Sequence, residues 1–140
     1  MTTERVDLKF HHGGISVPNL EASIAWYAAM LGFEVEKRFE IAAIPAKIAM
    51  LRRGDLRLEL FEVPGATALP EERRHPNPDL HTHGNKHVAF AVRDIDAAER
   101  ELRARGADIV LVGRFDHGNL FLRDNAGNLV ELIGEPALWT

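Results

Sequence analysis

Two histidines and two glutamates recur at matching points of the chain, and together they could bind a divalent metal ion. His12 opens the segment HGGISVPNLEASIAWY, and His87 opens HVAFAVRDIDAAERELRARG. Glu59 and Glu131 follow them at similar separations, in the apolar segments LRLELFEV and NLVELIGE. Imidazole nitrogens and carboxylate oxygens are ligands for first-row divalent metals. A repeat with the same His and Glu in both halves therefore predicts a four-ligand metal site.

The alternation of side chains across a strand predicts that these residues point away from the buried face. Each His shares its face with small residues, which leaves room for a ligand. An ionised Glu in an apolar strand is costly unless it is paired or binds metal. Taken singly, a hydrogen-bonded structural His or a solvent-facing Glu explains each residue, but the repeated match favours metal binding. The small neighbours are Gly14, Ser16, Ala89 and Ala91.

The elements that position these residues follow the order β-α-β-β-β in the first half. A strand over 9–17 precedes a helix over 20–31, where apolar residues recur at helical spacing. Asn19 is of a type that caps a helix start, and Gly32 suits its end. Three further strands are predicted over 33–44, 46–52 and 56–63, with Gly54-Asp55 as a turn.

The second half repeats this order after a linker rich in proline and glycine over about 64–85. Asp94 caps a helix that runs to about residue 105, and Gly106 ends it. The predicted strands are 86–92, 107–114, 119–123 and 128–134. We therefore expect one domain over residues 1–140, with one module over about 8–63 and a second over about 86–135.

Composition narrows the classes of function. At 140 residues with a net charge of −4, the chain suits a globular protein, and the charge argues against nucleic acid as a partner. It has no cysteine, which excludes disulfides and thiolate ligands. We find no segment typical of a signal peptide or a membrane span and expect a cytoplasmic protein with no membrane partner.

From about Phe10 to Glu135 the chain resembles the vicinal oxygen chelate superfamily, which includes glyoxalase I, methylmalonyl-CoA epimerase, fosfomycin-resistance proteins and extradiol dioxygenases. HGGISVPNLEASIAWYAAMLGFEV is similar to its first module. HVAFAVRDIDAAERELRARGADI with FLRDNAGNLVELI is similar to its second. The resemblance implies an α+β fold of two βαβββ modules, each a curled mixed sheet around a concave metal-binding cavity.

The resemblance carries the metal ligands onto His12, Glu59, His87 and Glu131. His11 is one residue out of register, and we expect it to face the opposite side. Two His with two carboxylates resemble glyoxalase I and related isomerases, whereas dioxygenases and fosfomycin-resistance proteins use a single Glu. Epimerases of the family usually have Gln where this chain has Glu59. Bacterial glyoxalase I usually has Tyr-Gly where this chain has Asn85-Lys86, so the substrate stays open.

The ligand set suits one Ni, Co, Zn, Mn or Fe ion per site. Such an ion can act as a Lewis acid that stabilises the enolate of a small carbonyl or thioester substrate. By resemblance, Glu131 or Glu59 removes the proton next to the carbonyl, and Glu131 is the preferred base. We expect a metal-dependent lyase, isomerase or epimerase. The alternatives are an Fe(II)-dependent dioxygenase and a non-enzymatic drug- or antibiotic-binding resistance protein.

The resemblance also implies a homodimer, and whether the four ligands come from one chain or two is left open. Weaker candidates for contacts to a small-molecule substrate are Arg57, Phe61, Phe115 and His117. For Arg57, pairing with Glu59 is the preferred interpretation. His81 and His83 in the linker are expected in a solvated loop, with a lid over the substrate as the alternative.

Overall fold

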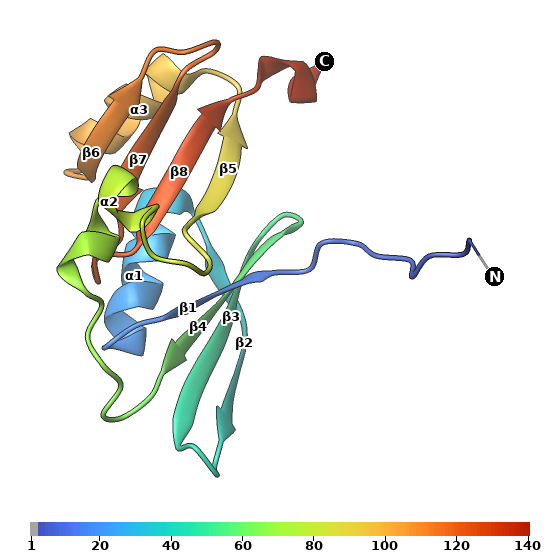
Figure 1. Ribbon diagram of the computed structural model, residues 1–140, viewed down its shortest axis with the longest axis vertical. Coiled ribbons are helices and arrows are strands. Elements are labelled where there is room, and N and C mark those ends of the chain that lie inside the picture. Colours follow the sequence, from blue (N-terminus) through green and yellow to red (C-terminus); the bar gives the residue numbers. More distant parts are fainter. Residues whose placement is uncertain (1–2) are drawn as a thin grey trace.

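The chain folds into two βαβββ modules joined by a linker that contains two short helices (Figure 1). This computed structural model describes residues 3–140. The first module contains β1 (Gly13–Ser16), α1 (Leu20–Leu31), β2 (Glu34–Ile41), β3 (Ala46–Arg53) and β4 (Leu56–Glu62). The linker contains η1 (Glu71–Arg74) and α2 (Pro76–Asp79). The second module contains β5 (Val88–Val92), α3 (Ile95–Ala104), β6 (Asp108–Gly113), β7 (Asn119–Arg123) and β8 (Leu129–Gly134), followed by η2 (Pro136–Trp139).

Each module has a four-stranded mixed sheet with the same topology. The strand orders are β1-β4-β3-β2 and β5-β8-β7-β6. The pairs β1–β4 and β5–β8 are parallel, because an α-helix connects the first strand of each module to the rest, and the other pairs are antiparallel. The two sheets lie one after the other and do not close on each other (Figure 1). The predicted α+β fold of two such modules is confirmed.

The helix caps agree with the sequence signals. The side chain of Asn19 accepts a hydrogen bond from the Ala22 amide at 3.0 Å, and Asp94 accepts one from the Ala97 amide at 3.1 Å. Gly32 ends α1 with a φ of 72°, a left-handed conformation that glycine adopts without a steric penalty. Both helices therefore begin at the predicted residues, because capping is a local interaction.

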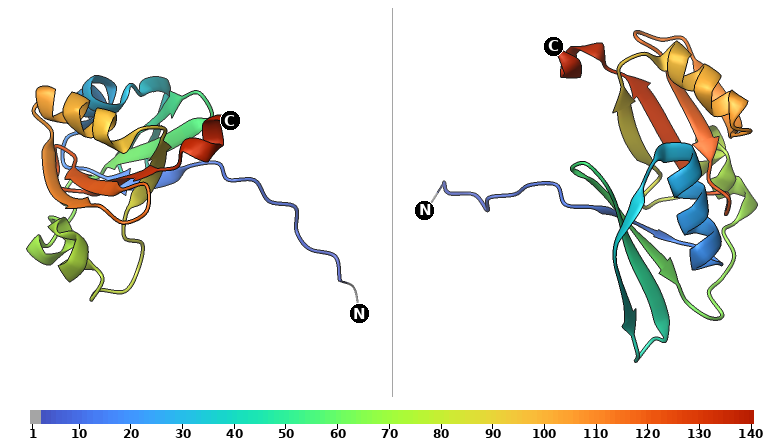
Figure 2. Two further views of the ribbon diagram at one scale, coloured as in Figure 1. Left: turned by 90° about the horizontal axis from the view of Figure 1, so that it is seen from above. Right: turned by 180° about the vertical axis from the view of Figure 1, so that it is seen from behind.

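Two predicted strands are shorter than the sequence suggested. The prediction of a strand over 9–17 is wrong at its start, because only Gly13–Ser16 pairs with β4. Gly13 pairs with Leu58, and β4 begins only two residues earlier, at Leu56. Residues before Gly13 therefore have almost no β4 backbone with which to form hydrogen bonds. Residues 3–12 instead form an extended arm that leaves the module (Figures 1 and 2). β5 likewise begins one residue after His87.

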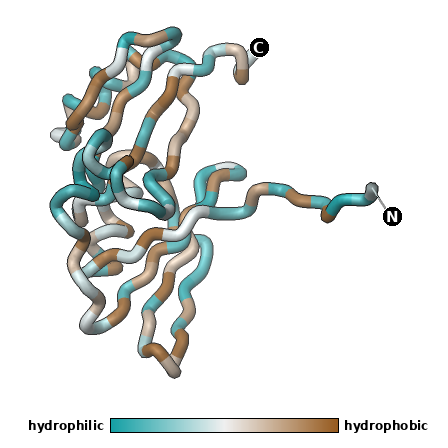
Figure 3. The backbone as a smooth tube through the Cα atoms, in the orientation of Figure 1, coloured by the Kyte–Doolittle hydropathy of each residue, from teal (hydrophilic) through white to brown (hydrophobic). Residues whose placement is uncertain are grey.

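A single hydrophobic core spans both modules. Helices α1 and α3 lie on the same side of the two sheets (Figure 2). Apolar residues of α1, such as Tyr27, join one buried cluster with residues of α3, such as Leu102. Burying one large apolar side chain contributes roughly 1.5–3 kcal/mol. Figure 3 shows hydrophobic stretches along the strands of both modules, and buried strand residues such as Leu60 and Leu122 belong to this core.

A buried polar contact fixes one module against the other. The Tyr27 hydroxyl, on α1, donates to Asp124 Oδ2 at 2.8 Å, and Asp124 Oδ1 accepts from two amides of the β7–β8 turn. Burial, followed by the adjacent Asp124 charge, raises the pKa of Tyr27 well above its ordinary value. The turn DNAGN, which the sequence showed only as a turn, therefore holds the first helix in place.

Candidate metal centre

In the first module, His12 and Glu59 come together at the edge of the sheet. His12 directly precedes β1, and Gly14 pairs with Glu59 on the neighbouring strand. This register brings His12 Nε2 to 3.4 Å from Glu59 Oε1. The two side chains are 33% and 16% exposed, respectively, so a ligand can reach both. His12 and Glu59 are far apart in the sequence, and the parallel pairing of β1 with β4 brings their side chains into contact.

The second module repeats this arrangement. Ala89 pairs with Glu131 in the parallel β5–β8 ladder, at the position where Gly14 pairs with Glu59 in the first module. His87 Nε2 lies 3.3 Å from Glu131 Oε1, with exposures of 25% and 16%. The two halves of the chain therefore present the same pair of donor atoms at nearly the same distance.

The geometry of each pair fits binding to one divalent ion. Two atoms that each lie about 2.1 Å from an ion are about 3.0–3.4 Å apart, depending on the coordination geometry. The two His–Glu distances of 3.4 and 3.3 Å agree with this. Within residues 3–140, however, no three His, Asp or Glu side chains gather into a group that could hold a metal. Each chain therefore presents two half-sites rather than one assembled centre.

The two histidines have different neighbours. His12 Nδ1 lies 2.7 Å from Nδ1 of His11, and the two rings meet edge to face. The prediction that His11 faces the opposite side is wrong, because both residues lie before β1, where strand alternation does not apply. The His87 ring instead packs edge-on against Phe121, with centroids 4.9 Å apart.

The glutamates also differ in their partners. Asn119 Nδ2 donates to Glu131 Oε2 at 2.8 Å. The structure places Arg57 against Glu36, with Nε 2.9 Å from Oε2, so the expected pairing of Arg57 with Glu59 is wrong. Glu36 lies on β2 and Arg57 on β4, and these two strands flank β3 in the sheet. Their long side chains reach across β3 to form the ion pair.

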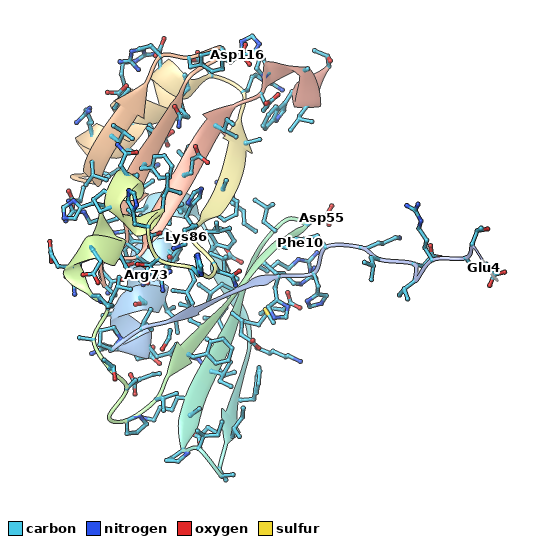
Figure 4. The ribbon with its side chains drawn as sticks, in the orientation of Figure 1. Glu4, Phe10, Asp55, Arg73, Lys86 and Asp116 are labelled. Carbon is cyan, nitrogen blue, oxygen red and sulfur yellow. The ribbon has the colours of Figure 1, made fainter. Side chains whose placement is uncertain are left out.

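The weaker candidates for substrate contacts lie in different places. The Phe61 ring covers Gly14, where an added Cβ would lie 3.1 Å from it, and so borders the first half-site. Phe115 is 90% exposed in the loop between β6 and β7. That loop contacts Gly134 through His117, at the end of β8 opposite to His87, and Asp116 marks its position in Figure 4. Phe115 and His117 are thus not brought to the half-sites.

The linker is more ordered than a solvated loop. Asp79 in α2 is 1% exposed and accepts from Arg73 Nε at 2.9 Å, while Lys86 Nζ lies 3.3 Å from the same oxygen. Lys86 also donates to the backbone oxygens of Asp79 and Thr82. Figure 4 shows Arg73 and Lys86 near each other where the linker returns to the second module. His81 and His83 follow α2 and are exposed.

A cleft of about 460 Å³ lies between β1, the linker and the start of β5. Of the four predicted ligands, only His87 lines it, so this cleft is an approach to one half-site and not the whole centre. Half of its lining residues are glycine or aliphatic, Arg73 and Lys86 add two cations, and four further side chains carry hydroxyl or amide groups. These belong to Ser16, Thr67, Asn85 and Asn128.

Sequence reasoning missed Asn119, Asp79 and Lys86. Asn119 carries no signal by itself, since an Asn at the start of a strand is common after a turn. Lys86 directly precedes His87, but its partner Asp79 lies in a segment that seemed to be an irregular linker. Only the folded chain shows that these polar side chains support the residues around the second half-site.

The sequence pattern of the Glyoxalase/Bleomycin resistance protein/Dioxygenase superfamily matches residues 9–132. The chain belongs to this superfamily. Among the described residues of this member, no helix is long and apolar enough to cross a membrane.

Individual relatives agree with this assignment. The chain is 33% identical over 110 residues to a 2-epi-5-epi-valiolone epimerase from Actinomyces sp, a match that covers 68% of this chain and 57% of that protein. A glyoxalase family protein from Enterococcus faecalis has a similar structure, with a TM-score of 0.74, 26% identity, and coverage of 89% and 95% of the two chains. A fosfomycin resistance protein from Listeria monocytogenes, solved with Mn(II), shares the fold with a TM-score of 0.62 at 17% identity, over 91% and 93% of the two chains.

Proposed function

We propose that this protein is a metal-dependent lyase, isomerase or epimerase of the glyoxalase type, acting on a small carbonyl compound or thioester. The observation that carries the proposal is the pair of matching His–Glu half-sites, each with its donor atoms at the spacing of two ligands on one ion. The similarity to an epimerase supports the same class of chemistry.

His12, Glu59, His87 and Glu131 would hold the ion. When bound, a divalent ion of this kind supplies Lewis acidity that stabilises an enolate. One of the two carboxylates, Glu131 or Glu59, takes the proton from the carbon next to the substrate carbonyl and returns it to the same carbon or its neighbour. Glu59 and Glu131 are mostly buried but keep 16% of their side-chain surface exposed, so either carboxylate can exchange a proton with a bound substrate.

The complete centre would be built by two copies of the chain. A single chain keeps its two half-sites apart, so four ligands meet only if the first half-site of one copy faces the second half-site of another. In a symmetric dimer, this contact occurs twice and gives two equivalent centres. Phe61, which borders Glu59 on the same strand, is then the best placed of the weaker substrate-binding candidates.

The cleft beside His87 supports a choice of substrate class. Its four hydroxyl and amide side chains, with the cations Arg73 and Lys86, favour a substrate that carries several hydrogen-bonding oxygens, such as a hydroxylated ketone. Such a substrate has a proton next to a carbonyl and an adjacent oxygen that can bind a metal. Epimerisation at that carbon is the reaction that we favour within the proposed class.

The first experiment is elemental analysis of protein purified without chelator or affinity tag. We expect close to one Ni, Co, Zn, Mn or Fe ion per chain. The metal-loaded protein should then exchange the proton next to the carbonyl of hydroxylated ketones with deuterium from the solvent, as NMR can follow. Protein that holds no metal and takes none up would instead support a resistance protein that sequesters a ligand, and oxygen uptake with an iron-loaded form would support a dioxygenase.

A further inference from the structure

Asn119, at the start of β7, contacts the second half-site without being a predicted ligand. It pairs with Ile133 on β8, two residues beyond Glu131, and therefore lies on the same face of the sheet as Glu131. Its side-chain amide donates from Nδ2 to Glu131 Oε2 at 2.8 Å. Because an ionised carboxylate only accepts hydrogen bonds, this contact requires the NH2 group of Asn119 to face Glu131.

This hydrogen bond distinguishes the two oxygens of Glu131. Oε2 accepts from Asn119, while Oε1 lies 3.3 Å from His87 Nε2. A Glu side chain has several rotatable bonds, and a free carboxylate loses rotational freedom when it binds an ion. Asn119 restricts this freedom before any ion arrives, so Oε1 is already directed toward the position that an ion would share with His87.

A glycine on the next strand makes this orientation of Asn119 possible. Gly113 on β6 pairs with Asn119, and a Cβ added at Gly113 would lie 2.1 Å from Asn119 Oδ1. Any other residue at position 113 would push the amide away from its present place. Position 113 must therefore be glycine, because the Asn119 side chain occupies the space that a Cβ would need.

The first module lacks the equivalent contact. Ile48 pairs with Phe61, which is two residues beyond Glu59, so Ile48 occupies the position that Asn119 has in the second module. An Ile side chain has no donor, and within residues 3–140 the contact of Glu59 at its half-site is His12. The difference between Asn119 and Ile48 makes the two carboxylates unequal despite the repeat.

We propose that Asn119 is a positioning residue that orients the Glu131 carboxylate toward the proposed metal position, with Gly113 providing the space that Asn119 needs. This rests on the proposed metal centre. Groups that hydrogen-bond to a metal ligand change metal affinity by about 10–100-fold. Asn119→Leu keeps a side chain of similar size but removes the donor, so we expect Co²⁺ affinity to fall by about 10-fold or more.

The experiment is a titration of metal-free protein with Co²⁺, followed by visible absorption, for wild type, Asn119→Leu and Gly113→Ala. Gly113→Ala should weaken Co²⁺ binding in the same direction without removing a polar group. Asn77→Leu, at an exposed position in α2, is the matched control and should leave Co²⁺ binding unchanged. Thermal unfolding of each variant checks that the fold survives.

A double-mutant cycle with Glu131→Gln separates positioning from a general structural effect. If Asn119 acts through Glu131, Asn119→Leu should have little further effect on Co²⁺ affinity once Glu131 is already changed. An equal loss in both backgrounds, or no loss in the wild-type background, would overturn the inference. If the wild-type protein binds no Co²⁺, the proposed metal centre itself fails, and this result is distinct from the other two.

Discussion

The two half-sites have the same candidate ligands and nearly the same His–Glu distance, but the second has more supporting contacts. Asn119 holds Glu131, and Phe121 packs against His87. In the first module, the polar contacts of His12 within residues 3–140 are those with the neighbouring His11 and with Glu59. The repeat thus reproduces the ligands and the strands that carry them, whereas the residues that fix those ligands differ between the halves.

The approach of the chain to each histidine shows the same contrast. Lys86, just before His87, is held by the linker through Asp79. Before His12, the chain is an extended arm with three large apolar side chains more than 80% exposed, Val6, Leu8 and Phe10 (Figure 1). Under the proposed metal centre, the better supported second half-site is the one that we expect to bind an ion first.

The largest effect should come from removing a ligand of the better supported half-site. Replacing His87 or Glu131 by Ala should remove most bound metal and all measurable turnover, while the fold remains. Metal content by elemental analysis, with circular dichroism as the check on folding, measures this. Full metal occupancy in both variants would rule out the four-ligand assignment.

The ion pairs of Asp79 with Arg73 and Lys86 in the linker can be broken by replacing the buried carboxylate of Asp79. Asp79→Asn leaves Arg73 and Lys86 without their shared charge partner and should lower the free energy of unfolding by about 3 kcal/mol. Because both cations are partly exposed to solvent, the loss is expected at the low end for a buried ion pair. Urea denaturation measures it. An unchanged midpoint would show that the linker does not stabilise the second module.

Conservative changes of the two glutamates sharpen the comparison between the half-sites. Glu131→Gln should weaken metal binding more than Glu59→Gln, by about 10-fold, since Asn119 supports only Glu131. Isothermal titration with the metal found in the native protein compares the two variants. Equal losses in both would mean that the hydrogen bond from Asn119 does not distinguish the two carboxylates.

The contact between the modules should give the smallest effect. Tyr27→Phe removes the hydroxyl that donates to Asp124 and should cost about 1–2 kcal/mol of stability. Because the folded-state pKa of Tyr27 is raised, its contribution is complete below the unfolded pKa of about 10 and is lost as the pH rises toward the folded value. Chemical denaturation at pH 8 and above pH 10 should therefore show a smaller alkaline loss in the variant than in wild type. Identical pH dependence in both proteins would contradict this role.

Local signals in the sequence were enough for most of the fold. Asn19 and Asp94 identify the helix starts because a cap acts over three residues, and alternation in LRLELFEV and NLVELIGE predicts the buried faces of β4 and β8. The duplication also predicted which His and Glu meet, since parallel pairing of equivalent strands brings them together. The late start of β1 could not be predicted, because it depends on the register in which β1 pairs with β4.

The sequence by itself determined the two modules, the superfamily and the four candidate ligands. The modules, the superfamily and the candidate ligands follow from short-range patterns and from the internal repeat, and the order of the residues contains both kinds of signal. The tertiary structure alone decided that the candidate ligands form two separated half-sites, that Asn119 and not Arg57 contacts one of the two glutamates, and that Tyr27 joins the modules. Each of these depends on side chains from distant segments, whose contacts are set by strand register and by the packing of one module against the other.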